Sequence, residues 1–218
     1  MKSYIDIHTH RPSGGTDVVS VFNQMLQESS LTFSDLFSIG LHPWYADQVS
    51  LEELSVLLDH TSMQENLYAF GECGLDKNCK ISFQKQQEVF ELHLEKCLKY
   101  RKPIVIHCIR AWDEIIEMTE NCSTIKILHG YNGSKELTTR LLKKGFCFSV
   151  GEAILNPNSK IGRAIQIIPT SALFLETDTS QFPIQAIYKA TAIALNIGEK
   201  ELREQIFENF LGSMSAGG

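Results

Sequence analysis

The sequence predicts an α/β fold in which helices pack around a sheet of parallel strands. Three observations predict this fold. Short runs rich in β-branched and aromatic residues recur along the chain, and segments with helical periodicity separate them. The length of 218 residues, with 43% hydrophobic and 21% charged residues, is ordinary for one globular domain. At this length, such alternation is typical of a (β/α) barrel or of a doubly wound open sheet.

Seven short apolar runs are expected to be strands: residues 4–8, 36–41, 67–71, 104–107, 125–129, 146–150 and 173–177. The clearest helix covers residues 84–100, where an apolar stripe repeats at helical spacing and Pro103 follows its end. Two further helical patterns, 183–196 and 199–211, follow the last strand and are expected to close the bottom or the side of a barrel. Residues 1–212 are therefore expected to form a single domain, and residues 213–218 a frayed tail.

Composition and charge exclude several classes of protein. The net charge of −6 disfavours tight, charge-driven binding to long nucleic acid, although it allows brief contact of a phosphodiester with a metal centre. The apolar stretches are far shorter than the roughly 20 residues that span a bilayer, and residues 1–8 do not resemble a signal peptide. The six cysteines contain no C-x-x-C pair. A cytoplasmic protein with reduced thiols is expected.

Histidines gather at the carboxyl ends of the predicted strands, which form the active face of a (β/α) barrel. His8 and His10 end the first strand, and the period of two in a strand places both on one side together with Asp6. His107 and His129 each end a further apolar strand. One such histidine is more often a core residue, but four at strand ends are a plausible set of metal ligands.

Two carboxylates complete this set of candidate ligands. Glu72 follows an apolar strand, where an unpaired charge is costly, so a cation partner is expected. Asp178 ends the last strand and is a candidate ligand and general base. His42 ends another strand and is expected to contact substrate, to support the ligands or to bond within its loop. Arg110 is expected either to meet a phosphate or to form a salt bridge at the start of a helix.

Four histidines and two carboxylates suffice for two divalent ions that share one carboxylate. Paired ions about 3.5–4 Å apart activate water for hydrolysis. The nitrogen-rich set suits zinc, manganese, iron or cobalt as well as magnesium, so the metal is left open. The sequence contains no phosphate-binding P-loop, dinucleotide-binding motif or serine-nucleophile motif that would indicate another chemistry.

Taken in order, these motifs resemble the TatD family of metal-dependent deoxyribonucleases, within the amidohydrolase-like metal-dependent hydrolases. The resemblance runs nearly end to end and rests on the following segments: DIHTH (6–10), GLHPW (40–44), GECGLD (71–76), Gln86 with Phe90, PIVIH (103–107), HGYNG (129–133) and ETD (176–178). It implies a TIM-type barrel and a magnesium-dependent nuclease that acts on DNA ends. It also implies one metal at His8, His10, Glu72 and Asp178, and a second at Glu72, His107 and His129, with Glu72 as the bridge.

The expected function is therefore that of a divalent-metal-dependent hydrolase, a TatD-type deoxyribonuclease that cleaves phosphodiester bonds with an activated water. Asp178 and Glu72 are the expected catalytic residues, and His42 and Arg110 the expected substrate-binding residues. The expected cofactors are two divalent ions, magnesium, manganese or zinc. DNA or a small phosphodiester is the expected transient substrate, with no membrane and no obligate protein partner. Two alternatives stay open: a hydrolase of a small phosphate ester, lactone or amide, and a non-catalytic binding protein that retains the metal.

Four departures from the family pattern affect these expectations. Only about thirty residues separate His10 from Gly40, too few for the strand and helix that the family usually carries there, so a distorted or shortened barrel with seven strands is expected. The chain enters a helix soon after Asp178, where the family has a longer loop. The HGYNG segment replaces HCFSG, and Arg110 lies one residue farther from His107 than the family arginine. The last three changes make the metal assignment firmer than the DNA assignment.

Overall fold

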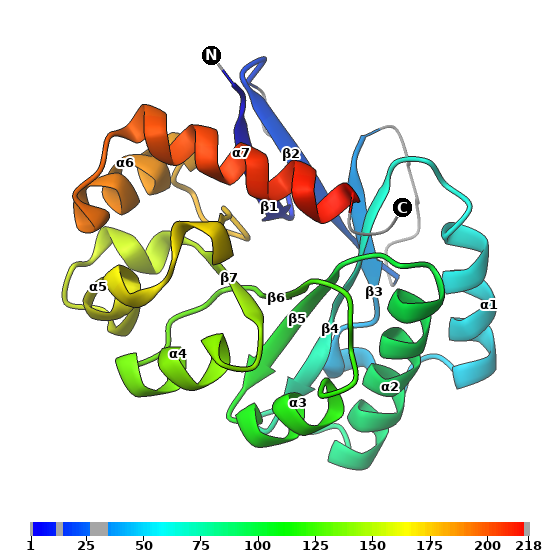
Figure 1. Cartoon of the computed structure of the whole chain (residues 1–218). Coiled ribbons are helices and arrows are strands. Elements are labelled where there is room, and N and C mark those ends of the chain that lie inside the picture. Colours follow the sequence, from blue (N-terminus) through cyan, green and yellow to red (C-terminus); the bar gives the residue numbers. More distant parts are fainter. Residues whose placement is uncertain (1, 12–14, 27–34, 216–218) are drawn as a thin grey trace. The chain divides into compact units, whose positions relative to one another are not determined.

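The computed structural model describes residues 2–11, 15–26 and 35–215. Within these residues, eight strands form one sheet in the order β1 to β8. From β3 onward, helices alternate with strands along the chain (Figure 1). The strands are β1 (Tyr4–Thr9), β2 (Val18–Met25), β3 (Phe37–Gly40), β4 (Leu67–Asp76), β5 (Ile104–Ile109), β6 (Lys126–Leu128), β7 (Phe146–Val150) and β8 (Leu173–Leu175). The α-helices are α1 (Leu51–Thr61), α2 (Phe83–Lys99), α3 (Trp112–Met118), α4 (Lys135–Leu142), α5 (Lys160–Ala164), α6 (Ile184–Leu195) and α7 (Glu199–Ser215).

The sheet is parallel wherever its register is defined, as the alternation of strands and helices predicts. Parallel pairing joins β1 to β2, β3 to β4, β4 to β5 and β7 to β8. A parallel bridge between Thr9 and Asp178 links the region after β8 back to β1. This connectivity is that of a (β/α) barrel rather than of a doubly wound open sheet.

The prediction that one strand is lost before Gly40 is wrong. Strand β2 lies in that interval and pairs with β1, with Val18 opposite Tyr4 and Ser20 opposite Asp6. Its β-branched residues Val18, Val19 and Val21 favour a strand, and the interval is long enough for this strand although it is too short for a strand and a long helix together. The sheet therefore has eight strands in the described residues rather than seven. Residues 27–34 lie outside the described part of the chain.

The described residues divide into two compact units, and the first comprises the described parts of 1–22 and 127–215. Its core includes buried side chains from β1, β7 and β8, such as Ile5, Phe148 and Phe174. Helix α6 is fastened to β1 by the Tyr188 hydroxyl, which accepts the N–H of Ile5 and donates to its carbonyl oxygen. Helix α7 packs against β1 and β8. Helices α6 and α7 thus hold β1 and β8 in place.

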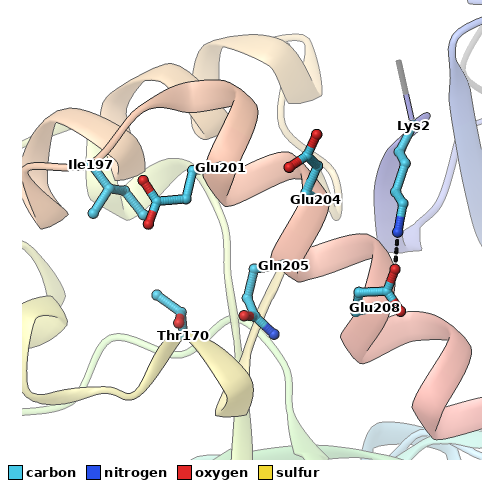
Figure 2. Close-up of a pocket in the computed structure, with 7 residues that line it drawn as sticks. All are labelled: Lys2, Thr170, Ile197, Glu201, Glu204, Gln205 and Glu208. Atoms are coloured by element: carbon cyan, nitrogen blue, oxygen red, sulfur yellow. Dashed lines mark ion pairs between the residues drawn. The ribbon is translucent and has the colours of Figure 1, made fainter.

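Helix α7 is longer than predicted. It continues to Ser215, and the buried Ser213 donates its hydroxyl to the carbonyl oxygen of Phe210, so the frayed tail expected from residue 213 is wrong for 213–215. Residues 216–218 lie outside the described part of the chain. Figure 2 shows a pocket beside this helix, where Lys2 forms an ion pair with Glu208. That ion pair connects the segment before β1 to α7.

The second unit covers the described residues of 23–126 and carries β3, β4, β5 and helices α1 to α3. Its strand β4 runs on to Asp76, past the predicted end at Gly71, because pairing with β5 continues from Cys73 opposite Ile106 to Asp76 opposite Ile109. Glu72 therefore lies within the strand rather than after it. No helix in the part of the chain that the structure describes is long and apolar enough to cross a membrane.

His93 on α2 is a packing residue. It is fully buried, its Nε2 accepts the N–H of Leu41 at 3.2 Å, and its Nδ1 lies 2.8 Å from the carbonyl oxygen of Val89. With Nε2 as the acceptor, Nδ1 carries the proton. Burial lowers the pKa of His93 to about 4, so the ring is neutral at pH 7. It fixes the chain just before His42, whereas His60 is exposed on α1.

Candidate metal centre

Glu72 on β4 is the centre of a buried group of ligand atoms in the second unit. Its Oε1 lies 3.1 Å from Nε2 of His42 and 3.0 Å from Nδ1 of His107. The centroids of the two imidazole rings are 4.4 Å apart. One ligand atom from each of the three residues lies within 4.8 Å of the others. Two imidazole nitrogens and a carboxylate oxygen in this arrangement fit a divalent transition metal.

Asn23 on β2 orients the Glu72 carboxylate. The backbone N–H of Glu72 donates to Oδ1 of Asn23 at 3.0 Å, and Nδ2 of Asn23 donates to Oε2 of Glu72 at 3.3 Å. The Ser38 hydroxyl donates to the same Oδ1 at 3.3 Å. Asn23 is 1% exposed, so these bonds are made away from water. The sequence does not indicate this residue, because its role depends on β2, and a lone asparagine in a run of valines carries no motif of its own.

The Asn23→Ala variant is expected to lose about 1–3 kcal/mol of unfolding free energy, because the buried N–H of Glu72 is left without its acceptor. Urea denaturation of the purified variant measures this loss. The matched control is Asn158→Ala, which removes an exposed asparagine and is expected to change stability by no more than about 0.5 kcal/mol. Equal stability of the two variants would show that Asn23 does not support Glu72.

Two glycines flank Glu72 for a steric reason. Gly71 and Gly74 adopt φ of 122° and 143°, and the Gly71–Glu72 peptide bond is cis. A Cβ atom on Gly71 would overlap the carbonyl oxygen of Val105, and one on Gly74 would overlap that of His107. Glycine at both positions therefore lets β4 approach β5 closely, which brings Glu72 and His107 together.

Asp76, the last residue of β4, lies on the other side of the His107 ring. Its Oδ2 accepts the indole N–H of Trp44 at 2.7 Å and lies 3.4 Å from Nε2 of His107, and its Oδ1 accepts the N–H of Asn78 at 2.7 Å. Burial raises the pKa of Asp76, but these hydrogen bonds outweigh burial and hold it below its usual value. His107 thus has Glu72 at Nδ1 and Asp76 at Nε2, the arrangement that orients metal-binding histidines.

Asp178 connects the ends of β8 and β1 in the first unit. Its N–H donates to the carbonyl oxygen of His8 at 2.9 Å, and the N–H of His10 donates to the carbonyl oxygen of Asp178 at 3.2 Å. Its side-chain Oδ1 lies 3.4 Å from Nε2 of His10 and 3.9 Å from Nε2 of His8. Nearby, Asp6 accepts two hydrogen bonds from Thr177, while burial raises the pKa of Asp6 to about 7. Two imidazoles and a carboxylate therefore converge here.

His129 follows β6 and lies against His8, with 4.5 Å between the ring centroids. Its Nδ1 lies 3.7 Å from Oε1 of Glu176, which is fully buried and accepts the N–H of Gly130 at 2.5 Å. Glu176 was not predicted as a site residue, although it stands in the motif that ends with Asp178. A buried carboxylate near this ring can hold its orientation.

The structure places each sequence-predicted residue in one of these groups or outside them. Four of the six predicted ligands lie together in the first unit: His8, His10, His129 and Asp178. The other two, Glu72 and His107, meet in the second unit. His42 contacts Glu72 directly, as a supporting residue would. Arg110 is exposed just after β5, with a φ of 55°.

Comparison with known proteins finds similarity to metal-dependent hydrolases and to nucleases. Residues 6–211 match the family model described as TatD related DNase. The chain is 29% identical over 154 residues to the uncharacterized metal-dependent hydrolase YjjV of Escherichia coli, covering 67% of this chain and 59% of that protein. It is 27% identical over 145 residues to the 3′-5′ ssDNA/RNA exonuclease TatD of Pantoea ananatis, covering 64% and 55%. It is 32% identical over 153 residues to the human 3′-5′ RNA nuclease TATDN2, covering 66% of this chain and 20% of that protein. The matches thus span little more than half of the bacterial relatives.

Two crystal structures have the same fold. The TatD homologue YjjV of Escherichia coli superposes with a TM-score of 0.82 at 21% identity, covering 97% of this chain and 98% of that one. A TatD family hydrolase of Entamoeba histolytica gives a TM-score of 0.77 at 16% identity, with 98% of each chain covered. The predicted TIM-type (β/α) barrel is therefore confirmed.

Proposed function

Because the chain belongs to the TatD-related DNase family, we propose that it is a divalent-metal-dependent hydrolase that cleaves phosphodiester bonds at the ends of nucleic acid chains. One observation carries the proposal: Glu72 is buried, and the nitrogens of His42 and His107 both approach the same carboxylate oxygen. A buried carboxylate that faces two imidazoles is typical of a metal site. The nuclease names of the relatives from Pantoea and from humans supply the substrate class.

The proposed ligands are the six residues that the sequence indicates: His8, His10, Glu72, His107, His129 and Asp178. We propose two divalent ions, magnesium, manganese or zinc. When bound, such ions lower the pKa of coordinated water and stabilise charge on the phosphoryl oxygens. Two contacts support this assignment: His8 and His10 lie beside Asp178 in the first unit, and His107 lies beside Glu72 in the second.

Asp178 is proposed to accept the proton of the attacking water. About a third of its side chain is exposed, at 36%, so solvent can reach the carboxylate. Its backbone N–H and carbonyl group are hydrogen-bonded to His8 and His10, and these bonds keep Oδ1 beside the His10 ring. Glu72 is fixed by Asn23, and His107 by Asp76, so these groups enter the reaction with little freedom to move.

Metal add-back tests the proposed function. Protein stripped of metal is expected not to shorten a labelled single-stranded DNA oligonucleotide, and magnesium, manganese, zinc or cobalt, supplied one at a time, is expected to restore cleavage. The His129→Ala variant is expected to lose at least about 100-fold in rate. The matched control is His60→Ala on the exposed face of α1, which is expected to cleave like the wild type.

If the protein binds metal but none of the four metals restores cleavage of the oligonucleotide, the proposed substrate is contradicted. Small phosphate esters, lactones and amides are then the substrates to assay. Absence of hydrolysis in all of these assays would favour a binding protein that retains its metal.

We also propose a cytoplasmic location without an obligate protein partner. The six cysteines are all free thiols, as is usual in a reducing compartment.

A further inference from the structure

A pocket in the second unit adjoins the candidate metal centre but holds none of the residues predicted to bind substrate. It has a volume of about 500 Å³. Its lining includes an aromatic ring, two isoleucines, a lysine and two residues of the centre: Trp44, Ile81, Ile109, Lys80, Asp76 and His107. His107 thus belongs both to the group around Glu72 and to the wall of this pocket. A ligand in the pocket lies next to the reacting groups.

Trp44 is held in one orientation although it is 54% exposed. Its indole N–H donates to Oδ2 of Asp76 at 2.7 Å, and its backbone N–H donates to Nδ1 of His42 at 3.2 Å. The indole and the His42 imidazole meet edge to face, with 4.8 Å between centroids. A large aromatic ring that is both fixed and exposed can stack on a planar ligand with little loss of side-chain entropy.

The other walls of the pocket favour a planar ligand that carries negative charge on one side. Ile81 and Ile109 supply apolar surface, and Ile109 is 37% exposed. Lys80 supplies a positive charge. Both oxygens of Asp76 already accept hydrogen bonds, from Trp44 and Asn78. The Asp76 carboxylate is therefore poorly suited to accepting hydrogen bonds from the edge of a base. A nucleobase attached to a phosphodiester matches this combination.

We propose that this pocket binds the nucleobase next to the scissile phosphodiester, with Trp44 as the residue on which the base stacks. The inference rests on the proposed function, which supplies a nucleic acid end as the substrate. Stacking on an aromatic ring tolerates all four bases, because each has a π-face. The substrate class is therefore single-stranded nucleic acid with little preference for sequence, which binds more weakly where the base at this position is missing.

Steady-state kinetics with two oligonucleotides tests the stacking role. One oligonucleotide has a normal base next to the cleaved bond, and the other has an abasic site there. The Trp44→Ala variant is expected to raise KM for the normal oligonucleotide about 5- to 150-fold, the equivalent of 1–3 kcal/mol of stacking, and to leave the abasic one unchanged. The Trp44→Phe variant keeps a ring but loses the N–H to Asp76, so its KM is expected to stay within about threefold while kcat falls. The exposed Met63→Ala variant is the control.

Fluorescence separates this inference from the proposed function. The chain has two tryptophans, Trp44 and Trp112, so a Trp112→Phe variant reports on Trp44 alone. In EDTA, a thymidine oligonucleotide is expected to quench this fluorescence more strongly than its abasic counterpart. If the wild type cleaves the normal oligonucleotide but neither KM nor fluorescence depends on the base, the pocket inference is overturned and the proposed function stands. If the wild type cleaves nothing, the proposed function fails, and quenching alone supports or overturns the base-binding pocket.

Discussion

Replacing Asp178 with Asn is expected to lower kcat on a single-stranded DNA oligonucleotide by about 10³-fold, the effect typical of a lost general base. Asparagine has the same size, but its amide cannot accept the proton of the attacking water. The hydrogen bonds of Asp178 with His8 and His10 are made by the backbone, so the substitution leaves the join between β8 and β1 intact. The variant is therefore expected to fold and to melt within a few degrees of the wild type.

Three measurements test the Asp178→Asn prediction. Single-turnover cleavage gives the rate, thermal denaturation gives the stability, and metal analysis gives the number of ions retained. A variant that retains its metal but not its turnover supports the proton-accepting role. The control is Asp47→Asn, an exposed carboxylate in the second unit, which is expected to retain full activity. A rate for Asp178→Asn close to that of the control would remove Asp178 from the mechanism.

The Glu72→Gln variant is expected to bind metal at least about 100-fold more weakly and to lose cleavage in proportion. Both His42 and His107 approach Oε1 of Glu72, so this one oxygen organises the group. A neutral amide does not offset the charge of a divalent cation, and it places either an oxygen or an NH₂ group at this position. The amide retains the length of the side chain and can still pair with Asn23, so the fold is expected to survive.

Titration of metal-stripped Glu72→Gln protein with manganese or zinc measures its affinity, and circular dichroism checks its fold. Glu52→Gln on the exposed face of α1 removes the same charge away from the centre, so its metal affinity is expected to match that of the wild type. If Glu72→Gln binds metal as tightly as this control, the proposed ligand set is wrong.

Local signals account for what the sequence predicts of the fold and of the candidate site. An apolar run of strand length that ends in histidine or a carboxylate is visible within a few residues, and parallel strands place their carboxyl ends on one face. For this reason the sequence indicates His8, His10 and His107 as candidate ligands. The same reasoning does not reveal β2, because the short interval between His10 and Gly40 argues against a further strand and helix.

The sequence by itself determined the parallel α/β architecture, the family and the candidate metal ligands, because all of these depend on the order and spacing of short motifs. Only the tertiary structure decided which groups hold those residues in place. Asn23 meets Glu72 across 49 positions of the chain, and Trp44 meets Asp76 across 32. Such pairs follow no period along the sequence, since they arise from strand order and from the close approach that glycine allows between β4 and β5. The pocket beside His107, which carries the inference about the nucleobase, exists for the same reason.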